Sequence, residues 1–269
     1  MKRHLRAILA RTPLWGPYRR LRARQEMRLV RRTYSEWTDV DERRAAFYGQ
    51  FVEAGDVVFD VGANIGNRTK VFAHLGATVV AVEPQRGCGD FLEEAYGGET
   101  HVHVVRAALG ASVGEADMQV STWSALSSLS PSWIEAVRAS GRHADALWTH
   151  SERVPVDTLD RLIDRYGLPT FVKIDVEGFE ADVIAGLSVP VAALSMEFHS
   201  EHVAGARRWL AHLSGIADYR FQLSFGESLE LTPQGWLTAS EFDARLDDLP
   251  DLSWGDAYAR LEGSPPHDG

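Results

Sequence analysis

The stretch that decides the fold is Val57-Val58-Phe59-Asp60-Val61-Gly62-Ala63-Asn64-Ile65-Gly66-Asn67. An apolar, β-branched run ends in Asp60, a glycine turn follows from Gly62 to Gly66, and a helix-like segment continues to His74. This order predicts a strand at 56–61 and a helix at 65–75. The turn between them would direct backbone N–H groups of the helix N-terminus at a ligand.

The residues of the turn indicate which ligand binds there. A dinucleotide fingerprint would place further glycines where this chain has Asn64 and Asn67. Asp60 would repel a pyrophosphate and would attract the ammonium of an amino-acid moiety. Glu83 lies 21 residues beyond Gly62, where a carboxylate can accept both hydroxyls of a ribose. A nucleoside that carries an amino acid and no phosphate is S-adenosylmethionine, which we therefore predict as the cofactor.

A second motif reads Thr170-Phe171-Val172-Lys173-Ile174-Asp175-Val176-Glu177-Gly178-Phe179-Glu180. Side chains alternate along a strand, so Lys173, Asp175 and Glu177 should share one face. At the carboxyl end of a strand in an open α/β sheet, such charges are typical of a binding crevice. The alternative is a solvated strand end that leads into a helix, whose first turn favours acids such as Glu180.

These motifs resemble the FkbM family of S-adenosylmethionine-dependent methyltransferases. The resemblance covers roughly residues 45–200 and includes Asp157-Thr158-Leu159-Asp160 between the two motifs. It implies an α/β, Rossmann-like class I methyltransferase fold: a mostly parallel twisted sheet, a C-terminal antiparallel hairpin, and helices on both faces. It also implies O-methylation of a hydroxyl on a sugar or natural product. The expected cofactor-binding residues are Asp60, Gly62, Ala63, Asn64, Gly66, Glu83, Pro84 and Asp175.

Methylation of an alcohol requires a group that accepts the hydroxyl proton. The expected candidates are Glu177 and His199, because His199 ends a predicted strand on which Glu197 shares its face. The alternative for His199 is a rim histidine that only hydrogen-bonds a neighbour. A further alternative is a divalent-metal site formed by Asp175, Glu177, Glu197, His199 and His202. Their spacing in the sequence does not show that these side chains meet in space, so we predict no metal.

The rest of the sequence alternates strands and helices, which predicts βαβ units. The expected strands are 56–61, 78–83, 102–108, 170–176 and 191–198, and the expected helices are 40–54, 65–75, 88–96, 179–187 and 202–213. A further helix is expected where Leu159, Leu162, Ile163 and Tyr166 fall at helical spacing, with Asp157 as its N-cap. Residues 219–225 and 228–231 are predicted to form a two-residue hairpin around Gly226-Glu227.

Residues 110–153 form an unusually long connection, for which we predict a lid or substrate loop. It should hold a hairpin made by Ala116–Ser121 and Arg153–Val156, and a short helix that starts near Pro131. Its three tryptophans are Trp123, Trp133 and Trp148. They either stack on the acceptor or form a small satellite hydrophobic cluster.

Charge divides the chain sharply. Residues 1–33 carry eleven Lys or Arg and one acid, and the remainder carries 17 basic and 37 acidic residues. This division predicts a basic arm at 1–39, a catalytic domain at 40–262 and a disordered tail at 263–269. The arm either contacts anionic lipid headgroups at the inner membrane surface or packs as a helical cap.

Composition limits the location and the partners. The sequence contains no run of 18 apolar residues, so it predicts no membrane-spanning helix. Cys88 is the single cysteine, which excludes an intrachain disulfide. We therefore expect a cytoplasmic protein. The Asp175-Val176-Glu177-Gly178 segment lacks the prolines typical of enzymes that methylate nucleobases, so the expected partner is a small-molecule hydroxyl acceptor and no nucleic acid. The oligomeric state stays open.

Two other classes of function remain as alternatives. A nicotinamide-dependent oxidoreductase would need the glycine fingerprint that positions 64 and 67 break. A non-catalytic binding protein on the same fold would keep the cofactor site and lack an acceptor pocket.

Overall fold

We describe a computed structural model of the chain, in which residues 36–264 are placed. Contacts divide the chain into two units, Met1–Asp39 and Val40–Gly269. The second unit carries the features discussed below. The predictions for residues 1–35 and 265–269, which include most of the basic arm and the tail, lie outside the described residues.

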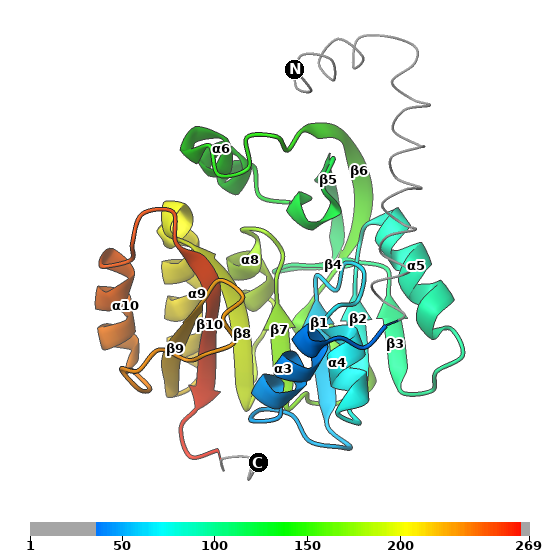
Figure 1. The fold of residues 1–269 in the computed structure, drawn as a ribbon, viewed down its shortest axis with the longest axis horizontal. Coiled ribbons are helices and arrows are strands. Elements are labelled where there is room, and N and C mark those ends of the chain that lie inside the picture. Colours follow the sequence, from blue (N-terminus) through cyan, green and yellow to red (C-terminus); the bar gives the residue numbers. More distant parts are fainter. Residues whose placement is uncertain (1–35, 265–269) are drawn as a thin grey trace. The chain divides into compact units, whose positions relative to one another are not determined.

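A seven-stranded sheet forms the centre of the second unit (Figure 1). Its order is β3-β2-β1-β7-β8-β10-β9, and within it β10 runs antiparallel to both of its neighbours while the other pairs are parallel. The strands are β1 (Val57–Val61), β2 (Thr78–Val82), β3 (Val102–Val105), β7 (Phe171–Ile174), β8 (Ala193–His199), β9 (Tyr219–Phe225) and β10 (Trp254–Leu261). The predicted α/β class and mostly parallel sheet are confirmed.

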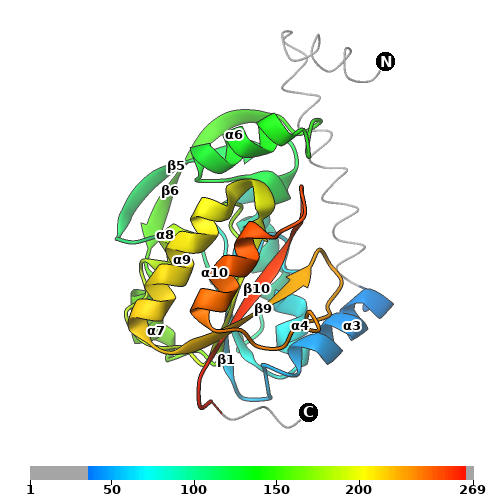
Figure 2. The same cartoon turned by 90° about the vertical axis from the view of Figure 1, so that its left-hand side faces the viewer.

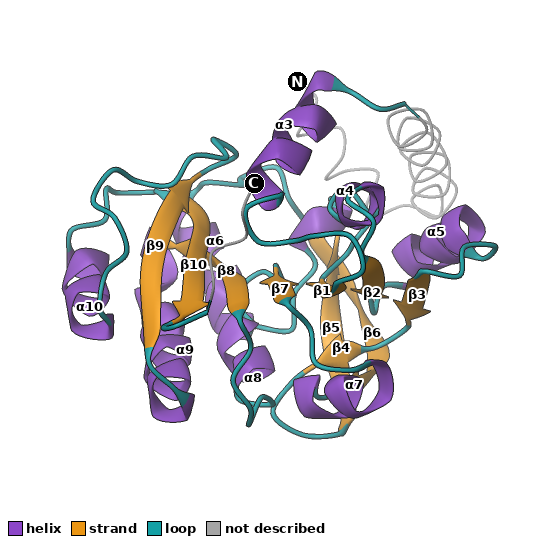
Figure 3. Cartoon of the chain, turned by 90° about the horizontal axis from the view of Figure 1, so that it is seen from below, coloured by secondary structure: helices purple, strands orange, loops and turns teal. Residues whose placement is uncertain are grey.

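Helices cover both faces of this sheet, as predicted (Figure 3). One face carries α3 (Asp39–Tyr48), α4 (Thr69–His74) and α5 (Arg86–Tyr96), and the other carries α7 (Leu159–Tyr166), α8 (Glu180–Ile184) and α9 (Val203–Ile216). Helix α10 (Ala239–Asp247) packs on α9 and β9 (Figure 2). None of the helices within residues 36–264 combines the length and the apolar character needed to cross a bilayer.

The core lies on both faces of the sheet because its central strands are apolar on both sides, as parallel strands between helical layers must be. Strand β7 is buried along its whole length. On one face, aromatic rings from α3, the turn after it and α4 pack edge-on or stacked against rings of β7 and β10; these rings are Phe47, Tyr48, Phe51, Phe72, Phe171 and Tyr258. This packing holds the central strands rigidly beneath their carboxyl ends.

The long connection after β3 is mostly regular. Strands β4 (Ala108–Leu109), β5 (Gly114–Ser121) and β6 (Trp148–Asp157) form a second sheet, and α6 (Pro131–Ser140) lies between β5 and β6 in sequence. The expected hairpin and the helix near Pro131 are thus confirmed. This insert lies beyond the carboxyl ends of the parallel strands (Figure 1).

Three local expectations were wrong. Residues 228–231 form no strand, because the longer β10 pairs with both β8 and β9 and buries Ala257, Tyr258 and Ala259. The predicted strand 102–108 divides, since Ala108 and Leu109 pair with β6 in the second sheet. The α7 cap is also Thr158, whose side chain accepts from the Arg161 N–H, and is not Asp157.

Candidate active site

Charged side chains from four strands meet at the carboxyl edge of the sheet. Asp60 lies on β1, Glu83 follows β2, Asp175 and Glu177 follow β7, and His199 ends β8. Because parallel strands end at one edge, the fold brings together residues that are more than 130 positions apart in sequence.

The turn after β1 depends on glycine. Gly62 has φ +82°, and a Cβ added there would lie 1.9 Å from the Asp175 carbonyl oxygen. Asn64 also adopts a left-handed conformation (φ 50°), which asparagine tolerates better than most residues. Gly66 (φ 78°) shapes the same turn and delays the start of α4 to Thr69. The β1 and β7 turns therefore touch through their backbones.

Glu83 is fixed by the backbone on both sides. One carboxylate oxygen accepts the Asn64 N–H at 2.8 Å, and the other accepts the Gln85 N–H at 2.7 Å. Each oxygen keeps a second lone pair for a ligand. Burial raises the pKa of Glu83 to about 7, although these two N–H groups act in the opposite direction. Glu83 is thus an oriented acceptor for a pair of hydroxyls.

An apolar cavity opens beside Glu83. It lies between the β2 end, the insert and the β7 turn, and its lining includes Pro84, Ala107, Leu109, Met118, Val176 and Phe179. Apolar walls with one oriented carboxylate suit a nucleoside, whose base is flat and whose ribose carries two hydroxyls.

A second, more polar cavity of about 440 Å³ adjoins the first. Both are lined by Gly62, Asn64 and Asp175, so they meet at the β1 turn. The second cavity is also lined by Asp60, Ala63, Glu177, Glu197 and His199. Two adjoining compartments could hold a nucleoside on one side and a second reactant on the other.

Asp60 is buried at the floor of the polar cavity. Its carboxylate accepts the Thr69 hydroxyl at 2.6 Å. Burial raises the pKa of Asp60, while the Thr69 hydroxyl and the nearby Lys173 act to lower it. An ammonium group of a ligand would find a buried carboxylate here.

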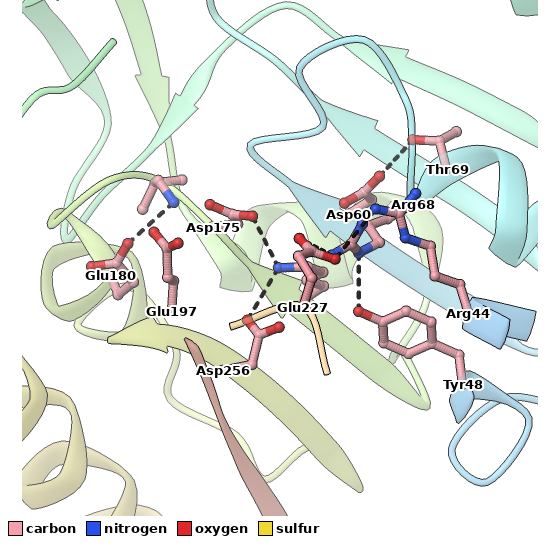
Figure 4. A network of polar contacts seen from close by, with 12 residues as sticks. Arg44, Tyr48, Asp60, Arg68, Thr69, Asp175, Glu180, Glu197, Glu227 and Asp256 are labelled. Atoms are coloured by element: carbon pink, nitrogen blue, oxygen red, sulfur yellow. Dashed lines mark hydrogen bonds and ion pairs between the residues drawn. The ribbon is translucent and has the colours of Figure 1, made fainter. Parts of the chain in front are cut away.

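Lys173 is a buried cation held between two carboxylates. Its ammonium lies 3.1 Å from Asp175 and 3.3 Å from Asp256, and its side chain is 1% exposed (Figure 4). Burial alone would lower the pKa of Lys173, but the two carboxylates raise it well above the ordinary value. For Asp175 the signs are reversed: burial alone would raise its pKa, but the neighbouring Lys173 ammonium holds the pKa of Asp175 below the ordinary value. Lys173 therefore stays charged and fixes Asp175.

Glu177 and Glu197 are carboxylates of a different kind. One oxygen of each is buried and has no hydrogen-bond partner within residues 36–264. Burial raises the pKa of Glu177 and of Glu197 well above the ordinary value, and each is raised further by neighbouring carboxylates. Glu180, in contrast, accepts the N–H groups of Val176 and Gly178 and secures the β7 turn.

His199 is held by the insert. The indole N–H of Trp133 donates to His199 Nδ1 at 3.2 Å, and both side chains are buried. Burial lowers the pKa of His199 to about 4, so the ring is neutral near pH 7. Because an indole only donates, Nδ1 must carry the lone pair and Nε2 the proton. Neither nitrogen can then accept a proton, so this geometry does not support a base role for His199.

The insert covers the site and is bonded to it at several points. The Ser128 hydroxyl donates to the Glu177 carbonyl oxygen at 2.7 Å, and the Gln85 amide donates to the Ser124 carbonyl oxygen at 2.8 Å. Trp133 and Trp148 belong to a small hydrophobic cluster with Leu126, Ile134, Val137 and Ala146, whereas Trp123 is 45% exposed. The insert therefore carries a satellite core and also lines the polar cavity.

Another part of the polar cavity is lined by Arg44 and Arg68, and both arginines form ion pairs with Glu227. Arg68 contacts both oxygens of Glu227 at 2.8 Å and donates to the Tyr48 hydroxyl at 3.2 Å (Figure 4). Arg44 also reaches Glu227, at 3.3 Å. These contacts tie α3 and α4 to the loop after β9 at the edge of the cavity.

The structure thus brings most of the predicted residues to one place. Asp60, Gly62, Ala63, Asn64, Glu83, Pro84, Asp175, Glu177 and His199 all line one or both cavities, whereas Gly66 shapes the turn and lines neither. Of the possible metal ligands, Glu177, Glu197 and His199 cluster, while His202 instead bonds Ser132. Sequence reasoning gave Trp133 no role at His199, because no local signal links residues 66 positions apart.

The comparisons with known proteins agree with this geometry. The sequence model described as the Methyltransferase FkbM domain matches residues 60–223, which is well over half of the 269 residues. This match confirms the resemblance seen in the motifs. No curated protein matches the chain in sequence.

Several solved structures show a weak similarity to the chain at low sequence identity. A TehB-like SAM-dependent methyltransferase from Corynebacterium glutamicum is 9% identical, with a TM-score of 0.44 over 88% of this chain and 97% of that one. A precorrin-6y C5,15-methyltransferase from Geobacter metallireducens is 10% identical, with a TM-score of 0.42 over 82% and 87%. A SAM-dependent O-methyltransferase from Thermotoga maritima is 10% identical, with a TM-score of 0.37 over 81% and 64%. Similarity at this level does not identify an acceptor.

Proposed function

Because the chain belongs to the FkbM family of S-adenosylmethionine-dependent methyltransferases, we propose that it methylates a hydroxyl group of a small molecule, a sugar or another natural product. The observation that carries this proposal is the polar cavity that adjoins the nucleoside cavity and is lined by two carboxylates, each with a buried oxygen that has no partner among the described residues. A cavity of about 440 Å³ suits a compact acceptor.

The residues present fit the cofactor. Glu83 would accept the two ribose hydroxyls, and the apolar wall that includes Leu109 and Phe179 would hold the adenine. Asp60 and the turn at Gly62 and Asn64 would hold the amino-acid end. When bound, the cofactor supplies a methyl group that its sulfonium already activates.

The chain's own contribution is to align the acceptor, exclude water and remove a proton. The insert, bonded to the β7 turn through Ser128 and to β8 through Trp133, supports the exclusion of water. A bound cofactor would supply the methyl carbon to the acceptor oxygen, and its sulfur would keep the electron pair of the carbon–sulfur bond. The acceptor proton then passes to a carboxylate of the Glu177–Glu197 pair.

His199 would act beside this pair as a donor. With the lone pair of Nδ1 engaged by Trp133, the Nε2–H can only donate a hydrogen bond. It would orient the acceptor oxygen toward the carboxylates. Glu177 therefore remains our proposed proton acceptor, and His199 becomes a group that positions the acceptor.

Cofactor affinity should depend on pH through Glu83. In the free protein the pKa of this carboxyl is about 7, and ribose hydroxyls bind best to the charged form. Below pH 7 the proton must leave before binding, so the affinity for S-adenosylhomocysteine should fall by up to about tenfold per pH unit. Above pH 7 it should level off. Calorimetric titrations between pH 5.5 and 8 measure this directly.

Glu83→Gln provides the comparison for that profile. The amide should weaken S-adenosylhomocysteine binding by about 1.5–3 kcal/mol, the range for a hydrogen bond to a charged group, and should remove the pH dependence. Because the amide also meets two backbone N–H groups, thermal unfolding must show that the variant is folded. A wild-type affinity that stays constant from pH 5.5 to 8 would contradict the role given to Glu83.

The tautomer of His199 should depend on Trp133. Trp133→Phe keeps an aromatic ring in the cluster but removes the N–H that donates to Nδ1. In the wild-type protein, nitrogen NMR of labelled histidine should show His199 protonated on Nε2 alone, and in the variant a mixture of both tautomers. Turnover should fall while cofactor affinity holds.

Trp148→Phe is a matched control. The indole of Trp148 packs against the same cluster but donates to the Leu126 carbonyl oxygen at 2.9 Å, away from His199. This variant should lose comparable stability without changing the His199 signals. If both variants shift the His199 nitrogens equally, the effect is general loosening of the insert and the positioning role is wrong.

The proposed activity can be tested without knowing the acceptor. Full-length protein with labelled S-adenosylmethionine would be screened against panels of sugars, polyketide alcohols, phenols, amines and RNA. We expect label transfer to hydroxyl compounds. Transfer confined to amines or RNA would overturn the O-methylation proposal, while S-adenosylmethionine binding would still report the cofactor site separately.

A further inference from the structure

Glu177 and Glu197 differ from the other acids at this edge of the sheet. Asp175 is paired with Lys173, Asp60 accepts the Thr69 hydroxyl, and Glu83 and Glu180 each accept two backbone N–H groups. Within residues 36–264, Oε2 of Glu177 and Oε2 of Glu197 are buried and have no hydrogen-bond partner; His199 Nδ1 lies 4.0 Å from Glu197 Oε2, beyond hydrogen-bond distance. In Figure 4, no dashed line reaches Glu197 from the residues drawn.

A buried carboxylate without a partner requires compensation. Removing a charged group from water costs several kcal/mol unless an opposite charge or hydrogen-bond donors replace the water. The side chain of Glu197 is only 10% exposed, so solvent does not supply that compensation. Lys173 cannot supply it directly, because its ammonium is engaged by Asp175 and Asp256.

The distances between the ligand atoms of Glu177, Glu197 and His199 match those across the coordination sphere of a metal ion. One ligand atom each from Glu177, Glu197 and His199 lie within 4.8 Å of one another. Metal–oxygen distances of about 2.0–2.6 Å place oxygens on opposite sides of a cation about 4–5 Å apart. The three side chains come from the β7 turn and the end of β8, two adjacent parts of the rigid sheet.

His199 decides the class of cation. Its lone pair on Nδ1 already accepts the Trp133 indole N–H, so it cannot also bind a metal in this arrangement. The remaining donors are carboxylate oxygens. Mg²⁺ and Mn²⁺ are commonly held by one or two carboxylates and complete their shells with water and substrate oxygens, whereas Zn²⁺ favours nitrogen and sulfur.

The backbone keeps Glu177 in place. Its φ of 56° lies in the left-handed region, which is unusual for glutamate, and such conformations cluster at ligand sites. Gly178, at φ +88°, packs so closely under Trp133 that an added Cβ would lie 2.3 Å from the tryptophan side chain. The insert therefore holds the β7 turn in the conformation that directs Glu177 into the cavity.

We propose that Glu177 and Glu197 bind one divalent cation of the Mg²⁺ or Mn²⁺ class at the floor of the acceptor cavity. This proposal adds a cation to the proposed acceptor site. It rests on the proposed function only in that the hydroxyl oxygen of the acceptor would complete the coordination shell of the cation. A cation there acidifies a bound hydroxyl and makes proton removal easier. The carboxylates themselves bind the cation before any acceptor arrives.

Direct binding tests this site without an acceptor. Full-length protein saturated with S-adenosylhomocysteine would be titrated with Mn²⁺ and followed by electron paramagnetic resonance. We expect one saturable site with a dissociation constant on the order of 10⁻⁴–10⁻³ M, as for sites with few charged ligands. Mg²⁺ should displace the Mn²⁺. The absence of saturable binding would overturn the proposal.

Variants locate the bound ion. Glu177→Gln and Glu197→Gln should each weaken Mn²⁺ binding at least about tenfold. Glu230→Gln, which removes the same charge from an exposed position in the loop after β9, should leave binding unchanged. If all three variants bind Mn²⁺ like the wild type, the ion lies elsewhere and the proposal is wrong.

A second readout avoids substitutions that could disturb folding. In the wild-type protein, bound Mn²⁺ should broaden the ring signals of His199, which lies beside the cluster, and should spare His101, which lies at the amino end of β3. Equal effects on both rings would indicate non-specific binding and overturn the assignment. Because none of these measurements needs an acceptor, Mn²⁺ binding without any O-methylation would refute the proposed function alone.

Discussion

Replacing Glu197 by glutamine should lower the turnover of a hydroxyl acceptor by about 100- to 10,000-fold, the usual effect of removing a group that takes part in proton transfer. Glutamine keeps the shape of the side chain but can neither accept a proton nor carry a negative charge. Glu177→Gln should have an effect of similar size, because both carboxylates face the same cavity. For Glu197→Gln the affinity for S-adenosylhomocysteine should stay within about threefold, since Glu197 lines the polar cavity and not the nucleoside cavity, whereas Glu177 lines both.

The measurement is single-turnover methyl transfer at saturating cofactor, alongside calorimetric cofactor binding. Glu230→Gln again serves as the surface control and should retain the wild-type rate. Turnover that is unchanged in both cavity variants would show that no carboxylate assists proton removal, and that alignment alone carries the reaction. Such a result is expected only for acceptors that are already acidic, such as phenols, so the assay should use an alcohol.

Lys173→Met should destabilise the fold by about 3–5 kcal/mol, the range for leaving buried charges without their partner. Methionine has a similar length and would fill the space, but Asp175 and Asp256 would then face each other without a cation. Water can only partly compensate, because the Asp256 side chain is 14% exposed, although that of Asp175 is 38% exposed. Chemical denaturation followed by fluorescence gives the free energy of unfolding.

Arg153→Met is the matched control for this prediction. Arg153 also contacts two carboxylates, Glu115 at 3.2 Å and Asp117 at 2.9 Å, but all three side chains are largely exposed. Exposed ion pairs contribute about 0–1 kcal/mol, so this variant should unfold nearly as the wild type does. If the two variants lose equal stability, burial does not govern the Lys173 cluster and our account of it is wrong.

The parts of the fold that the sequence predicts well are those encoded locally. The run that ends in Asp60, the turn at Gly62 and the carboxylate at Glu83 lie within 24 residues and follow one βαβ unit. Their arrangement is dictated by strand and turn geometry, so position in sequence nearly determines position in space. Asp175 was found for the same reason, as a charge at the end of a buried strand.

The strand prediction that was wrong concerns segments that are far apart in the sequence and compete for the same place in the sheet. Residues 228–231 do follow a turn at Gly226, yet β10, more than twenty residues later, occupies the place beside β9. The sequence did carry one signal for the intervening helix: Thr238 and Glu241 form a capping box at the start of α10. Which strand wins a place in a sheet depends on the total buried area, and no local pattern contains that information.

The role of His199 could not be predicted for a related reason. Its position at the end of β8 follows from the sequence, but its chemistry depends on which nitrogen is free. That choice is made by the indole N–H of Trp133, from a helix in the insert. Because Trp133, 66 residues away in the sequence, occupies Nδ1, the His199 ring can donate a hydrogen bond to the acceptor but cannot take its proton.

The place of β10 in the sheet has a consequence for biosynthesis. This strand, Trp254–Leu261, is the last one in the described chain, yet it lies between β8 and β9 and supplies Asp256 to the Lys173 cluster. A nascent chain still held in the ribosome can fold its N-terminal βαβ units early, but it cannot close the sheet or bring Asp256 to Lys173 until β10 has emerged. Premature termination would therefore yield a protein with a nearly complete cofactor turn and an open sheet edge, a product prone to degradation rather than to unproductive use of the cofactor.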